Sequence, residues 1–191
     1  MKLIYKYIPI EVLLMVVAIF LLNSQLIAQK SYTKNGNISF FSTSPLENID
    51  AKNNQVMSVL DTQTGSLQFS VIIKAFHFKK SLMEEHFNED YMESTKYPKA
   101  IFKGAFTDLK KIYFAKDGSY NVFVSGDFTL HGVTKKITVP GIITVKNGIP
   151  TAASKFTVKL ADYDISIPKI LKDNISENII ITVACTYDHK I

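Results

Sequence analysis

The most restrictive feature of this sequence is a repeated alternation of apolar and polar side chains, interrupted by only one stretch with helical spacing. Alternation with a period of two residues is typical of strands that bury one face and expose the other. The clearest runs are residues 67–78, 120–130, 136–146 and 178–187. About eight such runs occur, most of them joined by short turns. The pattern excludes a parallel α/β sheet and predicts an all-β antiparallel barrel or sandwich.

The one helical stretch lies between Lys79 and Gly104. Ser81 followed by Glu84 predicts a capping box, in which the hydroxyl and the carboxylate satisfy amides of the first turn. Pro98 restricts the residue before it, so the helix must end earlier. The apolar stripe on one face of this helix consists of Met83, Phe87 and Tyr91. We therefore expect a single short α-helix inserted between two strands.

Glycine and proline mark irregular points in the predicted strands. Gly104, Gly126 and Gly141 interrupt the apolar faces of three strands. Glycine there indicates either a sharp bend or the close approach of another group, so the sheet bends to close or leaves room for a guest. Pro140 predicts a sheet edge, a bulge or a bend. A single helical turn is expected at residues 46–51, directly after a Ser-Pro pair.

The N-terminal residues 1–28 read as an export signal. Two lysines precede an unbroken apolar run of 11 residues, Val12 to Leu22. A membrane span needs about 20 residues, whereas a run of this length suits the core of a signal peptide. Cleavage after Ala28 would leave residues 29–191 as one exported, periplasmic domain. A retained membrane anchor is the alternative interpretation.

The charged residues argue against a nucleic-acid partner. The formal net charge is +5, and every basic residue is lysine, because the sequence contains no arginine. Bidentate binding of phosphate is a property of arginine, and the lysines here form no basic run. Cys185 is the only cysteine, so no internal disulfide can form. Its apolar surroundings indicate a small buried side chain.

No set of residues has a spacing specific for catalysis. The best metal candidate is His86 with Glu89 on one helix face, among Glu84, Glu85 and Asp90. A catalytic zinc site wants three convergent protein ligands, and no third is evident. The cluster is typical of a charged, exposed helix face. We therefore predict no catalytic residue and no metal ligand.

Two blocks carry a family resemblance. They are LMEEHFNEDYMESTKYPKAIFKGAF, residues 82–106, and GDFTLHGVTKKITVP, residues 126–140. Together they resemble the YceI family of exported lipid-binding proteins, and the resemblance extends over essentially the whole of residues 29–191. Many members carry an arginine before an acidic–aromatic–glycine triplet. Here residues 160–164 read Leu-Ala-Asp-Tyr-Asp, without that arginine and with Asp164 in place of glycine.

The resemblance implies a lipocalin-like, eight-stranded antiparallel barrel that holds a polyisoprenoid, such as an isoprenoid quinone or a polyprenyl phosphate. It implies neither catalysis nor a cofactor. The missing arginine favours a neutral quinone or another long-chain lipid over a phosphorylated one. The expected interior residues are Phe69, Val71, Ile73, Met83, Phe87, Tyr91, Phe102, Phe106, Val122, Val124, Gly126, Phe128, Ile143, Phe156, Val158, Ile181 and Val183.

Two alternatives stay open at this point. An eight-stranded barrel is just wide enough either to be filled by its own side chains or to hold one small ligand. A filled barrel would suit a ligand-free envelope stress or interaction protein, and a metal-dependent hydrolase using His86 is the third hypothesis. Transient contact with a membrane is compatible with the sequence, as is either a monomer or a homodimer.

Overall fold

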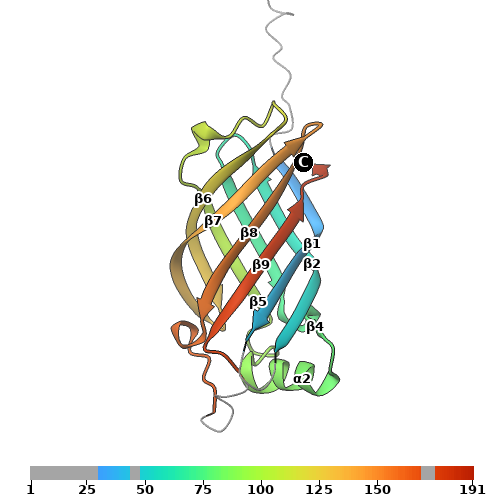
Figure 1. Ribbon diagram of the computed structural model, residues 1–191, viewed down its shortest axis with the longest axis vertical. Helices are drawn as coiled ribbons and strands as arrows, with labels where there is room; N and C mark the ends of the chain where they lie inside the picture. Colours follow the sequence, from blue (N-terminus) through green and yellow to red (C-terminus); the bar gives the residue numbers. More distant parts are fainter. Residues whose placement is uncertain (1–29, 44–47, 169–174) are drawn as a thin grey trace, which may run out of the picture.

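The chain forms a closed antiparallel barrel in a computed structural model that describes residues 30–43, 48–168 and 175–191. Each strand pairs with the next, and β9 pairs with β1 to close the barrel (Figure 1). The eight barrel strands are β1 (Lys30–Ser42), β2 (Ile49–Asp61), β3 (Ser66–Ile72), β5 (Lys99–Phe106), β6 (Gly118–Leu130), β7 (Val133–Lys146), β8 (Ile149–Lys159) and β9 (Asn178–Thr186). The predicted all-β, eight-stranded antiparallel barrel is confirmed. The predicted signal segment 1–28 lies outside the described residues.

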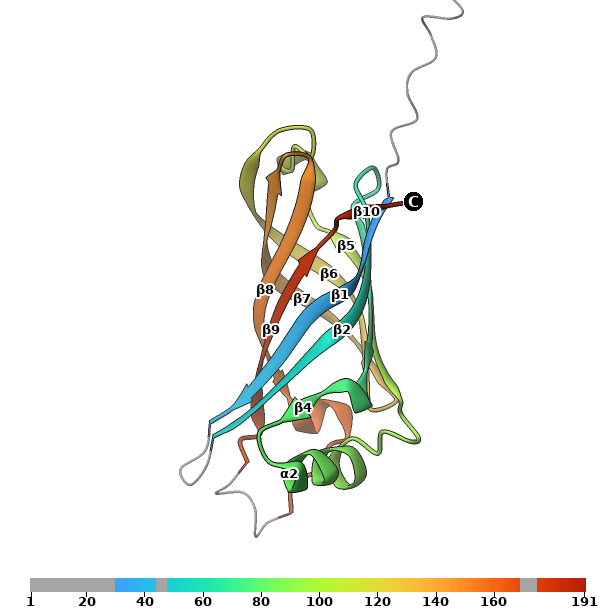
Figure 2. The same ribbon diagram turned by 90° about the vertical axis from the view of Figure 1, so that its right-hand side faces the viewer.

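Shorter elements flank the barrel. The two-residue strands β4 (His77–Phe78) and β10 (His189–Lys190) extend the sheet beside β2 and β1. In the described part of the chain, the single α-helix is α2 (Ser81–His86), which continues directly into the π-helical segment η2 (Phe87–Tyr91). Both lie beneath one end of the barrel, which we call the helix end (Figure 2). The turn between β7 and β8 and the C-terminus lie at the opposite end (Figure 1).

The start of the helix differs from the expected capping box. Lys80 is the N-cap residue and caps with its backbone, while Ser81 is already helical. The Glu84 carboxylate accepts a hydrogen bond from the Phe78 amide at 3.1 Å instead of reaching back to the first turn. The carboxylate therefore joins the helix to β4, and the capping-box prediction is wrong.

The predicted strand 67–78 is two elements. β3 ends at Ile72, which is paired with Lys99, and the chain then turns through the 3-10 segment η1 (Ile73–Ala75). Lys99 is the first residue of β5, directly after Pro98, so β3 has no ladder partner beyond Ile72. The Ile73 amide instead donates to the Pro98 carbonyl at 3.0 Å. The chain therefore folds across the helix end of the barrel.

Two smaller predictions are also wrong. Ile49 to Ala51 are strand residues of β2, paired with β1, where a helical turn was expected over residues 46–51. Residues 46 and 47 of that prediction lie outside the described residues. Pairing with a long neighbouring strand outweighs the local helix-start signal. The sequence also allows the strand that begins at Ala100 to extend over Ile112 to Phe114, where apolar residues recur. The chain after β5 instead forms the 3-10 segment η3 (Leu109–Lys111) and a loop that buries Ile112.

The irregular strand positions have identifiable roles. Gly104 and Gly126 face each other across β5 and β6, and a Cβ on Gly126 would overlap the Gly104 Cα and the Lys103 backbone. These two glycines therefore allow a close approach between neighbouring strands. Pairing between β7 and β8 ends at Gly141 and Ser154, next to Pro140, which has no amide to donate. The Ser154 hydroxyl donates to the Pro140 carbonyl at 2.6 Å, so proline marks a local sheet edge, as predicted.

The end opposite the helix is densely filled. We call it the packed end and define it by Val56, Leu60, Val145 and Tyr187, none of which is more than 2% exposed. The Ser58 hydroxyl donates to the Gln68 carbonyl at 2.9 Å, so the Tyr187 hydroxyl, at 2.8 Å, donates to Ser58. Because each buried polar atom of this pair has a partner, the tyrosine closes this end without an unsatisfied group.

Candidate functional site

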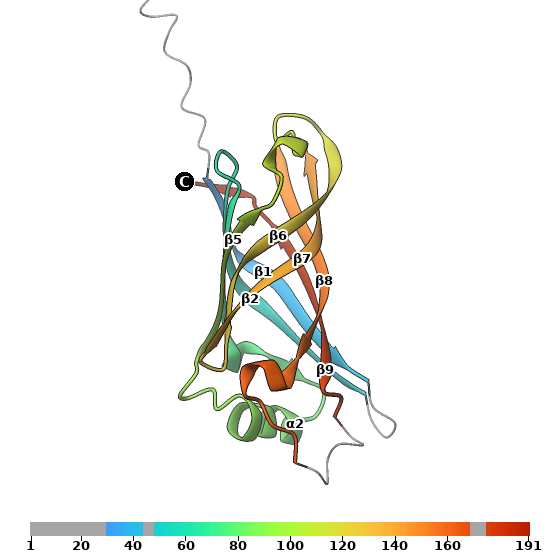
Figure 3. The same ribbon diagram turned by 90° about the vertical axis from the view of Figure 1, so that its left-hand side faces the viewer.

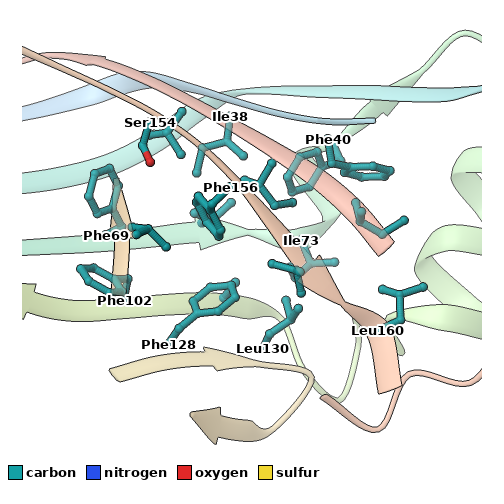
Figure 4. A pocket seen from close by; sticks show the side chains of 18 of the residues that line it. Ile38, Phe40, Phe69, Ile73, Phe102, Phe128, Leu130, Ser154, Phe156 and Leu160 are labelled. Atoms are coloured by element: carbon teal, nitrogen blue, oxygen red, sulfur yellow. The ribbon is translucent and has the colours of Figure 1, made fainter. Parts of the chain in front are cut away.

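A large, mainly apolar cavity runs through the barrel interior towards the helix end. Its volume is about 740 Å³, and all eight barrel strands, α2 and η2 contribute to its lining. Figure 4 shows side chains from several strands converging on this space, and Ser154 carries the only oxygen among the side chains labelled there. The four residues that define the packed end do not line this cavity. The cavity is therefore an apolar chamber that is closed above and bordered by the helix below.

The alternation of the strands places the predicted interior residues around this cavity, with one exception. The predicted residues that line it are Phe69, Val71, Ile73, Met83, Phe87, Tyr91, Phe102, Phe106, Val122, Val124, Phe128, Ile143, Phe156, Val158, Ile181 and Val183. Gly126 does not line it, because its Cα packs against Gly104 within the wall. The placement of Gly126 at the cavity is therefore corrected. Contact of the other residues with a ligand stays a prediction.

Several lining residues were not on the predicted list. Ile38 and Phe40 face inward from β1, while Phe41 points outward, as the alternation in that strand indicates. Extending the period-two rule to β1 would have found both residues. Phe76 and Phe78 also line the cavity, but they follow the turn at η1, which breaks the alternation. No local sequence signal places them there.

Four phenylalanine rings gather where the cavity meets the helix. Phe87 of η2 lies 5.3 Å from Phe40, 5.7 Å from Phe76 and 5.0 Å from Phe78, measured between ring centroids. These distances are those of favourable aromatic pairs. The cluster fixes η2 against β1 and β4, and it forms an apolar boundary for the cavity at this end.

The ionisable side chains of the lining lie on the same helical segment, α2 and η2. His86, Asp90 and Tyr91 all border the cavity. The His86 Nδ1 atom lies 2.6 Å from the Asp90 carboxylate. Burial, and after it the negative charge of Asp90, raises the pKa of the Tyr91 phenol above its usual value. The phenol therefore stays protonated and able to donate at neutral pH.

The HGVTK stretch of the sequence ties the helix end together from outside the cavity. His131 is nearly buried, and its Nε2 atom lies 3.0 Å from the Glu93 carboxylate while its Nδ1 atom lies 3.1 Å from the Tyr163 carbonyl. Tyr163 belongs to the 3-10 segment η4 (Leu160–Tyr163), which lies near the helix in Figure 3. Gly132 has a φ of +77°, and the Tyr97 ring packs on it. This motif is a structural junction between the helix region, the β6–β7 turn and η4.

Cys185 lies away from this cavity, at the packed end. Burial raises the pKa of its thiol to about 12, so the reactive thiolate is not formed at neutral pH. Its sulfur also lies against Gly36, where a Cβ would meet it. The predicted role of Cys185 as a small buried side chain is therefore confirmed.

Neither metal ligation nor a membrane span is evident in the described residues. Within the ranges that the structure covers, no three His, Cys, Asp or Glu side chains are grouped so that they could hold a metal ion. His86 has one carboxylate neighbour, Asp90, and no third donor from this set. In the same part of the chain, no helix combines the length and apolar character needed to cross a membrane.

Comparison with known proteins gives one family and several similar folds. The sequence model of the YceI-like domain matches residues 31–187. A polyisoprenoid binding domain from Saccharophagus degradans, implicated in plant cell wall breakdown, is 15% identical; it superposes with a TM-score of 0.73 over 85% of this chain and 99% of its own.

Two further structures resemble the chain. BcnA from Burkholderia cenocepacia is 16% identical with a TM-score of 0.65, over 79% of this chain and 95% of its own. The YCEI protein of Campylobacter jejuni is 18% identical with a TM-score of 0.60, over 76% and 88%. At these identities the likeness concerns the fold. No curated protein matches the sequence significantly.

Proposed function

The chain belongs to the YceI-like domain family, and from this premise we propose that it is a binding protein, not an enzyme, whose barrel holds a long apolar lipid. The lipid we propose is a polyisoprenoid or an isoprenoid quinone. The protein would be exported, lose residues 1–28, and carry or store this lipid in the periplasm. The apolar cavity of about 740 Å³ is the observation that carries the proposal.

The physical character of the cavity suits such a ligand. Its volume lies within the range of about 300–1,000 Å³ that is typical of small-molecule sites. Its wall is made almost wholly of aliphatic and aromatic side chains, such as Phe69, Phe102 and Phe128. Each ligand CH₂ group buried there contributes about 0.8 kcal/mol. A long hydrocarbon chain can therefore bind well with few polar contacts.

A hollow interior argues against the ligand-free alternative. Protein interiors are normally packed to the density of organic crystals, and voids larger than a water molecule are few. The packed end of this barrel meets that standard, with Leu60 and Val56 fully buried. Leaving a large apolar chamber beside it costs stability unless a guest occupies the space. The cavity therefore favours a ligand over a filled barrel.

The test is direct extraction. The full chain is expressed with its N-terminal segment, purified without detergent, and extracted for lipid mass spectrometry. We expect one isoprenoid or long-chain lipid species per protein molecule. The purified protein, stripped of lipid by unfolding and refolding, should also bind an added isoprenoid quinone.

A folded protein that carries no lipid and refuses added quinone would contradict the proposal and favour the ligand-free barrel. Fractionation of the expressing cells tests the location separately, since we expect the shortened protein in the periplasmic fraction. Metal analysis of the same sample tests the hydrolase hypothesis. A bound metal that is lost in His86→Ala would revive it.

A further inference from the structure

The polar groups of the cavity are distributed unevenly. The Ser154 hydroxyl donates a hydrogen bond to the Pro140 carbonyl, and the Ser42 hydroxyl accepts one from the Ser176 amide at 3.0 Å. His86 Nε2 and the Tyr91 hydroxyl, in contrast, make no hydrogen bond with any other residue that the structure describes. Both residues line the same cavity. Polar atoms without a protein partner are thus found where the cavity meets the helix.

The local backbone explains why these residues share one face. α2 passes into the wider π-helical turn η2 directly after His86, and Tyr91 is the last residue of that turn. Segments of π-helix are rare and occur frequently at functional sites. Here the wider turn allows His86, Asp90 and Tyr91 all to border the cavity. The side chains of His86 and Asp90 are 52% and 61% exposed, so this polar group lies at the mouth of the chamber.

The hydrogen-bonding roles of these side chains follow from their chemistry. The Asp90 carboxylate can only accept, so the His86 Nδ1 atom donates to it across 2.6 Å. In a neutral imidazole whose proton is on Nδ1, the Nε2 atom is an acceptor. The Tyr91 phenol is a donor that can also accept. The mouth therefore offers one acceptor and one donor beside an acidic side chain.

We infer that this mouth binds a neutral, hydroxyl-bearing headgroup, either the alcohol of a polyprenol or the phenol of a prenylated hydroquinone. The ligand hydroxyl donates to His86 Nε2 and accepts from Tyr91, while the prenyl chain fills the cavity below. Asp90 disfavours a phosphorylated headgroup, because a carboxylate repels a phosphate. This inference rests on the proposed function and adds the headgroup class to it.

The experiment compares ligands that differ only at the headgroup, using protein stripped of lipid. The probes are geranylgeraniol, geranylgeranyl phosphate and a hydrocarbon of the same chain length; a prenylated hydroquinone and its quinone form a second pair. We expect the alcohol to bind more tightly than the phosphate, and the hydroquinone more tightly than the quinone. The two pairs together distinguish an alcohol from a phenol as the preferred source of the hydroxyl.

Variants then locate the effect. His86→Ala and Tyr91→Phe should each weaken binding of geranylgeraniol by about three- to tenfold, the value of one hydrogen bond. Neither should change binding of the hydrocarbon by more than about twofold, since its contacts are apolar. Asp90→Asn should keep an acceptor for His86 and selectively strengthen binding of the phosphate. His77→Ala and Glu89→Gln are matched controls on side chains that do not line the cavity.

The outcomes separate the two proposals. If neither the hydrocarbon nor the alcohol binds, the proposed function fails. If both bind, but equally and without response to His86→Ala or Tyr91→Phe, only the headgroup inference is overturned. Tighter binding of the phosphate than of the alcohol by the unaltered protein also overturns it. Hydrocarbon binding by each variant shows whether its cavity is intact.

Discussion

The two ends of this barrel are built from the same alternating strands but are finished differently. At the packed end, Leu60 and Tyr187 are almost completely buried, and the tyrosine hydroxyl is satisfied by Ser58. At the helix end, phenylalanine rings from β1, β4 and η2 surround an open chamber, and His86 borders it while half-exposed. The packed end is therefore an ordinary hydrophobic core, whereas the helix end encloses a cavity.

The difference lies in the space between inward-facing side chains. Along β7, Val145 is buried in the packed end, whereas Gly141, four residues earlier, borders the chamber and fills little of it. Ala152 on β8 is likewise a small residue at the cavity wall. The pattern of apolar residues sets which side chains face inward. Their volumes decide whether the interior is filled.

The largest expected effect is the difference in unfolding free energy between two leucine-to-alanine variants, one at each end of the barrel. Leu60→Ala at the packed end should lower the free energy of unfolding by about 2–5 kcal/mol, because it leaves an enclosed cavity among buried neighbours. Leu130→Ala at the chamber should cost clearly less, since Leu130 is only partly buried and already borders open space. Urea denaturation of both variants, stripped of lipid, gives the comparison. Equal costs would mean that the chamber is packed like the other end.

The second test concerns the wall itself. Gly126→Ala should lower the free energy of unfolding by about 1–3 kcal/mol, because the added Cβ meets the Gly104 backbone on the neighbouring strand. Gly141→Ala should cost less, since its Cβ would meet only the Ala153 carbonyl closely, at 3.1 Å. Thermal and urea unfolding measure both. A Gly126→Ala protein as stable as the original would show that the two strands do not need this close approach.

The alternating strands made much of this predictable from sequence, including the inward positions of Phe69, Phe102 and Phe128. Other features depend on partners far along the chain. The end of β3 at Ile72 is set by where β5 begins after Pro98. The packed end is closed by Tyr187, whose hydroxyl is hydrogen-bonded to Ser58, 129 residues away in the sequence. No local sequence pattern encodes such pairings. The sequence therefore could not show which end of the barrel is filled and which end holds the cavity.

Alkaline pH should destabilise the folded protein, and the largest contributions should come from two side chains of the packed end. Burial raises the pKa of the Tyr187 phenol above its ordinary 10.0 and that of the Cys185 thiol from 9.0 to about 12. The unfolded chain therefore loses these protons at a lower pH than the folded protein does. Stability is fully present below pH 9 and falls as the pH rises above it, by about 1.4 kcal/mol per pH unit for each group once fully engaged.

Urea unfolding between pH 7 and pH 11 measures this dependence. Tyr187→Phe should reduce the slope above pH 10, because it removes one of the titrating groups. Tyr113→Phe is the matched control, since Tyr113 is 63% exposed, and it should leave the slope unchanged. An unchanged slope in Tyr187→Phe would show that the buried phenol does not set the alkaline limit.

The variant with the smallest expected effect on stability tests most directly whether lipid occupies the chamber. Val139→Phe adds volume to a side chain that lines the chamber beside Ile137, so it moves this part of the barrel towards the filled state of the packed end. Because the added ring enters empty apolar space, the free energy of unfolding should change by no more than about 1 kcal/mol. The amount of co-purified lipid should fall at least severalfold.

Thr138→Phe, on the exposed face of the same strand, should retain the lipid. Full lipid occupancy in Val139→Phe would mean that the ligand does not occupy the part of the chamber next to Val139, because the same space cannot hold both the ring and the chain.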